Sequence, residues 1–370
     1  MPPKSPRGAF SPLSRSFFTV LPYIAGLLLW GPTLYNGTFK ALLEAPLTGQ
    51  LNQYTQLRTN YTGIFVLDYF IGVMVAFFYP ATSAQDEGYQ LFVLDAYSTF
   101  ACGFVWLHTE ASRPGPKPKW ITRVATLGWL WQAFGAAIIL PIFYAIHIPW
   151  ASQKTLPRVI DVNRARALTP ALLLGVAAPT AFIMAPAWMG PNYRLADEHQ
   201  IYVAIFMLSP IWVAGILEAT TLAGASLRSV ATTRTNRSAA AWWVRAAYLQ
   251  TCAISAVGHL YPTYKLLVAE NPEIVNLTRM YVPAPFEGPS GVEDILVIGS
   301  WLFLQYDHII ISLSSLSWAL VLLRKTPLDR IPTIVMILLL LVGSVVLGPG
   351  ATVSLALYLR EGHLSADKKS

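Results

Sequence analysis

Stretches of apolar residues long enough to cross a lipid bilayer recur along nearly the whole of this 370-residue chain. About 20 helical residues span a hydrocarbon core of about 30 Å, so each stretch predicts one membrane-crossing helix. The stretches cover residues 17–34, 61–79, 91–108, 124–148, 167–188, 200–222, 241–268, 294–323 and 331–359. They predict an all-α fold, a polytopic transmembrane bundle of eight or nine helices, with the last stretch interrupted at residues 348–350.

Composition agrees with a single membrane domain. Charged residues make up 12% of the chain and its mean hydropathy is +0.48, whereas a typical soluble domain has about 25% charged residues. We expect residues 17–359 to form one transmembrane helical domain between a basic cytosolic tail, residues 1–16, and a polar tail, residues 360–370. The first apolar run lacks a small-residue cleavage site at its end, which favours a retained signal anchor.

The net charge of +7 does not indicate a nucleic-acid partner. Lys and Arg stand in short loops between apolar runs, where they set topology and contact anionic lipids, so we expect membrane lipids as partners. With the N-terminus in the cytosol, nine crossings place Arg113, Lys117 and Lys119 in the lumen, against the positive-inside rule. Either an early segment is re-entrant or this loop is an exception.

Four carboxyl groups stand inside apolar runs: Asp68, Asp95, Glu218 and Asp307. An ionisable side chain at the centre of a membrane helix costs about 2.5–3.5 kcal/mol, so each is a candidate functional residue. The predicted helix bounds place Asp68 and Asp307 deepest, and Asp95 and Glu218 nearer helix ends. An interhelical hydrogen bond or ion pair is the purely structural explanation for each.

Candidate substrate-binding side chains flank these acids, share their helices or reach the same level of the bundle: Tyr69, Trp301, Tyr306, His308, His259 and Trp318. In the nine-helix topology Asp68, His259, Asp307 and His308 face one cavity. Residues adjacent to Asp307 in sequence point about 100° away from it on a helix. Most single aromatic side chains in such a protein serve packing or interfacial belts instead.

Several motifs are missing from the sequence, and their absence narrows the chemistry. There is no Asp-Asp pair, so neither a DDxxD nor a DxDD run is present, and there is no Asn-x-x-x-Asp, Gly-rich phosphate loop or Gly-x-Ser-x-Gly. No His-x-x-x-His or Cys-rich spacing occurs, so we predict no protein-bound metal and no cofactor. Cys102 and Cys252 both lie in apolar runs, which indicates packing residues rather than a disulfide.

Isolated carboxyls among abundant aromatics suit acid chemistry. Desolvation raises the pKa of a carboxyl in an apolar pocket, so that it stays protonated and can act as an acid. It can then protonate an epoxide oxygen or an alkene, and aromatic faces stabilise the resulting carbocation by about 2 kcal/mol. We assign Asp307 and Asp68 as acid and partner in undetermined order, with Asp95 and Glu218 as second-rank candidates.

The sequence also resembles a known family. FVLDYF (65–70), LFVLDAYSTFACGFVWLH (91–108) and WLFLQYDHIIISLSSLSWAL (301–320) are similar to the fungal membrane-bound terpene cyclases of meroterpenoid pathways, including ascofuranone and macrophorin biosynthesis. The resemblance implies an isomerase of the endoplasmic reticulum membrane that needs neither metal nor cofactor. Its substrate would be lipid-like, a prenylated compound whose farnesyl tail is cyclised after protonation of an epoxide or terminal alkene. It also implies functional coupling to a prenyltransferase and an epoxidising monooxygenase.

Two other functions use the same buried carboxyls. In a proton-coupled transporter they would relay protons, and in a noncatalytic membrane scaffold they would only join helices. A transporter built from duplicated halves would show paired broken helices, and the sequence has no convincing repeat. The terpene cyclase is therefore the preferred prediction.

Overall fold

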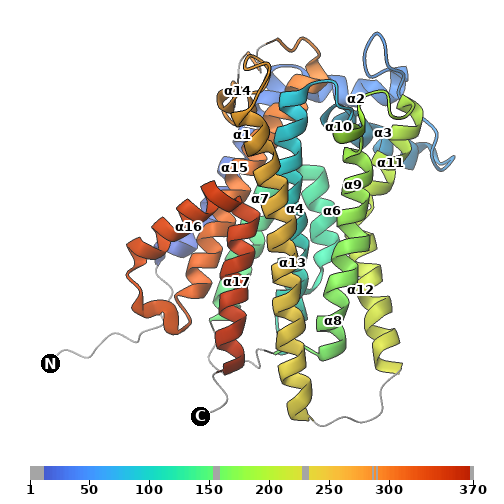
Figure 1. Ribbon diagram of the computed structural model, residues 1–370. Coiled ribbons are helices and arrows are strands. Elements are labelled where there is room, and N and C mark those ends of the chain that lie inside the picture. Colours follow the sequence, from blue (N-terminus) through green and yellow to red (C-terminus); the bar gives the residue numbers. More distant parts are fainter. Residues whose placement is uncertain (1–11, 153–158, 227–232, 286, 289–290, 367–370) are drawn as a thin grey trace.

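The computed structural model describes the chain except residues 1–11, 153–158, 227–232, 286, 289–290 and 367–370. Within that part the regular elements are helices. One isolated β-bridge also pairs Gln50 with Gln56. The long helices run side by side in a bundle, with short helices across its upper end (Figure 1). The predicted all-α class is thus confirmed for the described residues.

The helices follow the predicted apolar runs closely at some places and divide them at others. In chain order they are α1 (Pro12–Tyr35), α2 (Thr38–Thr48), α3 (Phe65–Thr82), α4 (Glu87–Ser112), α5 (Lys119–Thr122), α6 (Val124–Phe134), α7 (Ala136–Ala151), α8 (Val162–Leu172), the π-helix η1 (Leu173–Ala177), α9 (Ala178–Met184), α10 (Pro186–Met189), α11 (Ala196–Met207), α12 (Ser209–Ser226), α13 (Thr233–Leu267), α14 (Leu277–Tyr281), α15 (Ile295–Leu323), the 3₁₀-helix η2 (Pro327–Arg330), α16 (Thr333–Leu347) and α17 (Pro349–Ala366).

The number of membrane crossings differs from the prediction. Five described spans are long and apolar enough to cross a bilayer, and the pair α11 and α12, bent by 54°, makes a sixth. The apolar helices α7 and α16 are shorter. The count of eight or nine crossings is therefore not confirmed, because Gly residues divide two of the predicted runs. Gly135 separates α6 from α7, and Gly348, at φ +88°, separates α16 from α17 at the predicted interruption.

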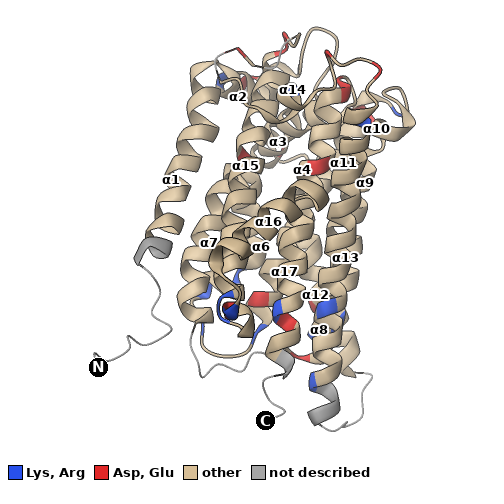
Figure 2. Cartoon of the chain, turned by 60° about the vertical axis from the view of Figure 1, so that its left-hand side comes forward, with Lys and Arg blue, Asp and Glu red and all other residues tan. Residues whose placement is uncertain are grey.

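The path of the early helices decides at which end of the bundle the basic loop after α4 lies. α1 runs toward the end of the bundle that holds α2 and α14, and α4 starts at that end and runs back (Figure 2). The segment between α1 and α4 therefore returns the chain to the end where α1 finished. Arg113, which follows α4, pairs with Glu361 near the end of α17. Many of the Lys and Arg residues lie at this lower end (Figure 2).

The last helix continues beyond residue 360. α17 continues to Ala366, and Arg360 and Glu361 are buried at 6% and 1% exposure because they form ion pairs with Glu110 and Arg113. At the other end α1 begins at Pro12, and the first eleven residues of the predicted N-terminal tail lie outside the described residues.

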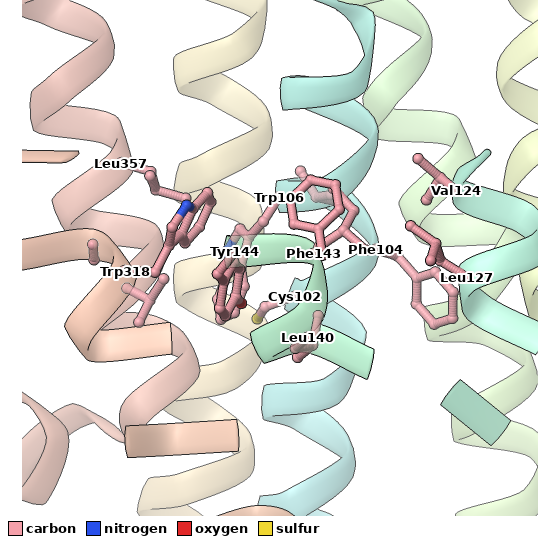
Figure 3. Close-up of a cluster of buried hydrophobic side chains, with 14 of the residues drawn as sticks. Cys102, Phe104, Trp106, Val124, Leu127, Leu140, Phe143, Tyr144, Trp318 and Leu357 are labelled. Carbon is pink, nitrogen blue, oxygen red and sulfur yellow. The ribbon is translucent and has the colours of Figure 1, made fainter. Parts of the chain in front are cut away.

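Large aromatic side chains fill the centre of the lower half. Figure 3 shows Trp318 of α15 beside Tyr144 of α7, with Trp106 and Cys102 of α4 close by. The rings of Tyr144 and Trp318 stack at 4.6 Å between centroids. Close-packed rings of this kind hold α4, α7 and α15 at fixed spacing. Elsewhere in the bundle α4 and α15 also line a cavity.

Candidate active site

Asp307 lies near the middle of α15 and lines a cavity inside the bundle. Its side chain is 3% exposed. The amide N–H of Ala137 donates to its Oδ1 at 2.6 Å. Among the described residues no side chain forms a hydrogen bond with this carboxyl. The acid is thus held by backbone alone and faces the cavity without a charged partner.

The break between α6 and α7 makes this contact. Gly135 has φ +101°, a conformation that favours glycine, and it turns the first amides of α7 toward α15. A Cβ at Gly135 would lie 2.4 Å from Leu29 Cδ2 and 3.3 Å from Asp307 Oδ1, so no larger residue fits. The partial positive charge at the start of a helix favours an anion. The start of α7 therefore favours the charged form of the Asp307 carboxyl.

Aromatic rings form most of the cavity wall. They come from five helices that are far apart in sequence: Phe77, Phe78, Tyr97, Phe100, Phe104, Trp131, Phe206 and Phe303. Phe104 and Trp131 stack at 4.9 Å, and Tyr97 and Phe206 stack at 5.7 Å. Such a wall excludes water and presents the negative faces and the edges of its rings. It is suited to a carbocation, which aromatic faces attract.

Two further polar groups line the cavity. The Oε1 atom of Gln132 and the hydroxyl of Tyr97 are buried and have no hydrogen-bond partner among the described residues. A buried polar atom without a partner costs about 1–3 kcal/mol. These atoms are available to an oxygen-bearing ligand in the cavity.

Asp68 does not line this cavity. α3 begins at Phe65 rather than at residue 61, so Asp68 lies in its first turn and not deep in a span. Its carboxylate accepts hydrogen bonds from the amides of Tyr61, Thr62 and Gly63, and from the Thr62 hydroxyl at 2.8 Å. These contacts close the loop before α3. The expectation that Asp68 and Asp307 face one cavity is therefore not met.

Asp95 belongs to a second polar cluster. Its Oδ2 lies 2.9 Å from Nδ1 of His259 and accepts a hydrogen bond from the Tyr281 hydroxyl at 2.7 Å. The ring of His308 lies 6.5 Å from that of Tyr281, so His308 turns toward this cluster while its neighbour Asp307 turns to the cavity. His259 thus contacts Asp95 rather than Asp307, and Asp95, His259 and His308 do not line the aromatic cavity.

Glu218 lies toward the outside of the bundle. Its carboxylate forms an ion pair with Arg164 at 2.7 Å, and its side chain is 57% exposed. It therefore fits the structural explanation, an ion pair between α8 and α12.

The remaining aromatic candidates also lie apart from the cavity. Tyr69 donates to the carbonyl of Leu43, Trp318 donates through its indole N–H to His147, and Tyr306 does not line the cavity. Trp301 stacks on Tyr89 at 4.6 Å. All four share a helix with a predicted acid but point to other neighbours.

Sequence reasoning missed most of the cavity wall. Gln132 is a polar residue within the apolar run 124–148, and the glycine three residues later marks the helix break. Both residues could have been identified from the sequence. The aromatic residues of α3, α6 and α11 carry no comparable signal, because aromatics abound throughout the chain.

Comparison with known proteins assigns the family. The CtvD domain matches residues 14–365. The terpene cyclase DEP1 of Fusarium langsethiae is 28% identical over 95% of this chain and 99% of its own length. The terpene cyclase ctvD of Aspergillus terreus is 25% identical over 83% and 86%, and the terpene cyclase ascI of Acremonium egyptiacum is 25% identical over 71% and 68%. No solved structure gives a match.

These matches cover nearly the whole chain, including every helix that lines the aromatic cavity. The predicted resemblance to fungal terpene cyclases is confirmed, and so is the prediction of an enzyme rather than a transporter or a scaffold. The chain belongs to the CtvD-domain family and is a terpene cyclase.

Proposed function

We propose that this terpene cyclase is an integral protein of the endoplasmic reticulum membrane. It acts there on a prenylated, farnesylated meroterpenoid intermediate, and Asp307 is the acid that starts cyclisation. The observation that carries the proposal is a single buried carboxyl among aromatic rings, held by the amide of Ala137. The apolar spans support the membrane location.

The reaction balances without a co-reactant. A proton passes from Asp307 to an epoxide oxygen or to a terminal alkene carbon of the farnesyl tail. The epoxide C–O bond then breaks, or the alkene becomes a cation, and neighbouring double bonds attack in turn to form rings. The last cation then loses a proton to a base, and Asp307 takes up a proton again, so the net reaction is an isomerisation.

The protein contributes three physical effects to these steps. The first amides of α7 stabilise the carboxylate left on Asp307. Rings such as those of Phe104 and Trp131 stabilise the migrating positive charge, by about 2 kcal/mol when desolvated. The same wall keeps water from quenching the cation early.

The decisive variant is Asp307→Asn. Asn keeps the oxygen that accepts from Ala137 but cannot donate an acid proton, so turnover should fall about 10²–10⁴-fold, the usual contribution of a general acid. Microsomes from a host without cyclase activity would be fed a farnesylated epoxide and the products measured by mass spectrometry.

Asp68→Asn and Asp95→Asn are the matched controls, since they make the same change outside the cavity. Both should retain turnover much closer to that of the wild type. Wild-type turnover by Asp307→Asn would refute the assignment of the acid.

Other enzymes must make the substrate of such a cyclase. A prenyltransferase must attach the farnesyl tail, and an epoxidising monooxygenase must act first if the epoxide is the group protonated. We include functional coupling to both, and contact with membrane lipids, in the proposal.

A further inference from the structure

A second cavity lies beside the first. It is a groove of about 370 Å³ between α4, the segment from η1 to α10, and α13. Ala181, Met184 and Trp188 line one side, and Val257 and Tyr261 line the other. The wall is almost entirely apolar.

The groove and the Asp307 cavity share part of their walls. Tyr97, Ala101 and Thr180 line both spaces. Ala101 is small, and the Thr180 hydroxyl is turned back to the carbonyl of Val176 at 2.7 Å. The Tyr97 ring is therefore the largest group between the groove and the acid.

The volumes show that the inner cavity is not the whole binding site. It measures about 50 Å³, whereas sites for drug-sized ligands measure about 300–1,000 Å³. The groove alone reaches that range at about 370 Å³. A prenylated substrate can place its reacting end beside Asp307 only if the rest of the molecule lies elsewhere.

The groove opens on an apolar flank of the bundle rather than at a polar end. Val257 and Trp188 at its rim are 68% and 50% exposed, and Phe182 beside it is 56% exposed. On a water-soluble protein such an exposed apolar patch would promote aggregation, but it is the normal surface of a lipid-facing helix. The π-helix η1 ends at Ala177 in the groove wall, and π-helical turns are frequent at functional sites.

We propose that the prenylated substrate enters the enzyme through the groove between α4, α9 and α13, and that the groove also binds the non-reacting part of this substrate. The substrate enters sideways from the lipid, and its reacting end passes Tyr97 to reach Asp307. This inference rests on the proposed function, because it assumes that Asp307 protonates one end of a long substrate.

The first test fills the groove in the full-length enzyme. Ala181→Trp places a large side chain in the groove, and KM for a farnesylated epoxide should rise at least tenfold. Ala219→Trp is the matched control, since Ala219 is exposed on α12 and lines neither cavity. Gly258 is unsuitable for this purpose, because a Cβ there would lie 2.3 Å from the Cβ of Ser98. Wild-type KM for Ala181→Trp would overturn the proposal.

The second test does not depend on turnover. A farnesyl analogue with a diazirine at its non-reacting end would be photolysed with the Asp307→Asn variant in microsomes. Label should appear on peptides that contain residues 94–101, 177–188 or 254–261, which line the groove, and an unlabelled farnesylated epoxide should compete with it. Label elsewhere would overturn the proposal. So would uncompeted label, since the groove would then hold a bilayer lipid.

The two proposals fail in different ways. If the wild-type enzyme cyclises the epoxide and Ala181→Trp matches it, the groove is wrong and the proposed function stands. If the wild-type enzyme cyclises neither a farnesylated epoxide nor the farnesylated compound with an intact terminal alkene, the proposed function is wrong.

Discussion

Two buried carboxyl groups of this cyclase have opposite surroundings. Glu110 of α4 belongs to an ion-pair network with Arg113, His147, Arg360 and Glu361, which we call the Glu110 network. Asp307 of α15 has one short backbone hydrogen bond and a wall of aromatic rings. Glu110 is 0% exposed and Asp307 is 3% exposed. Burial alone therefore does not distinguish a structural acid from a catalytic candidate.

The difference lies in the partners. Both oxygens of Glu110 are engaged, with Arg113 and Arg360 on Oε1 and His147 on Oε2, at 2.7–2.9 Å. These contacts join α4, α7 and α17. A charge so fully paired has no proton to offer and holds helices together. A carboxyl without a cation, next to a cavity, can exchange a proton with a ligand.

The largest effect is expected for Glu110→Gln. Removing one partner leaves Arg360 buried and unpaired, which typically costs about 3–5 kcal/mol of unfolding free energy. Thermal unfolding in detergent, followed by size-exclusion chromatography, would measure the loss. Asp307→Asn should show no comparable loss, although it removes activity.

A double variant tests whether the lost stability comes from leaving a buried charge unpaired. Glu110→Met with Arg360→Met removes both charges and leaves the pair of Arg113 and Glu361 in place. Replacing a whole buried pair by apolar residues is often neutral, so part of the lost stability should return. Wild-type stability of Glu110→Gln would show that the network does not hold the helices.

A smaller effect is expected for Asp68→Ala. The amides of Tyr61, Thr62 and Gly63 lose their acceptor, and a typical lost hydrogen bond costs about 0.5–1.5 kcal/mol. Limited proteolysis should cut the loop faster, while the turnover of folded enzyme stays within about twofold of the wild type. A loss of turnover as large as that of Asp307→Asn would return Asp68 to the catalytic candidates.

The smallest effect is expected for Glu218→Ala. The pair with Arg164 is more than half exposed on the glutamate side, and exposed pairs contribute about 0–1 kcal/mol. Stability and turnover should both match the wild type in the assays above. A clear loss of turnover would contradict the view that only carboxyls at the cavity act on the substrate.

Much of the helical framework was predictable from the sequence. The run 294–323 corresponds to α15 within one residue, and the run 91–108 lies inside α4. The break at Gly348 was also predicted, since Gly and Pro interrupt helices in any surroundings. The start of α3 was not predicted, because residues 61–64 of the predicted run belong to a loop whose amides donate to Asp68.

The candidate site was only partly predictable. Asp307 was identified because a carboxyl in an apolar run is costly and rare. Its surroundings were not identified, because Phe77, Trp131 and Phe206 come from helices whose packing no local pattern specifies. The adjacent pair Asp307 and His308 illustrates the limit, since one faces the cavity and the other faces Tyr281.

By itself, the sequence determined that this is a helical, largely apolar chain with a few isolated carboxyls, and its resemblance pointed to a terpene cyclase. These are local properties, readable from runs of residues and from short segments. Only the tertiary structure decided what each carboxyl does. Asp68 meets loop amides, Asp95 meets His259 and Tyr281, and Asp307 meets an open aromatic cavity. The physical reason is that a carboxyl's chemistry depends on its neighbours in space, and packing between distant helices selects those neighbours.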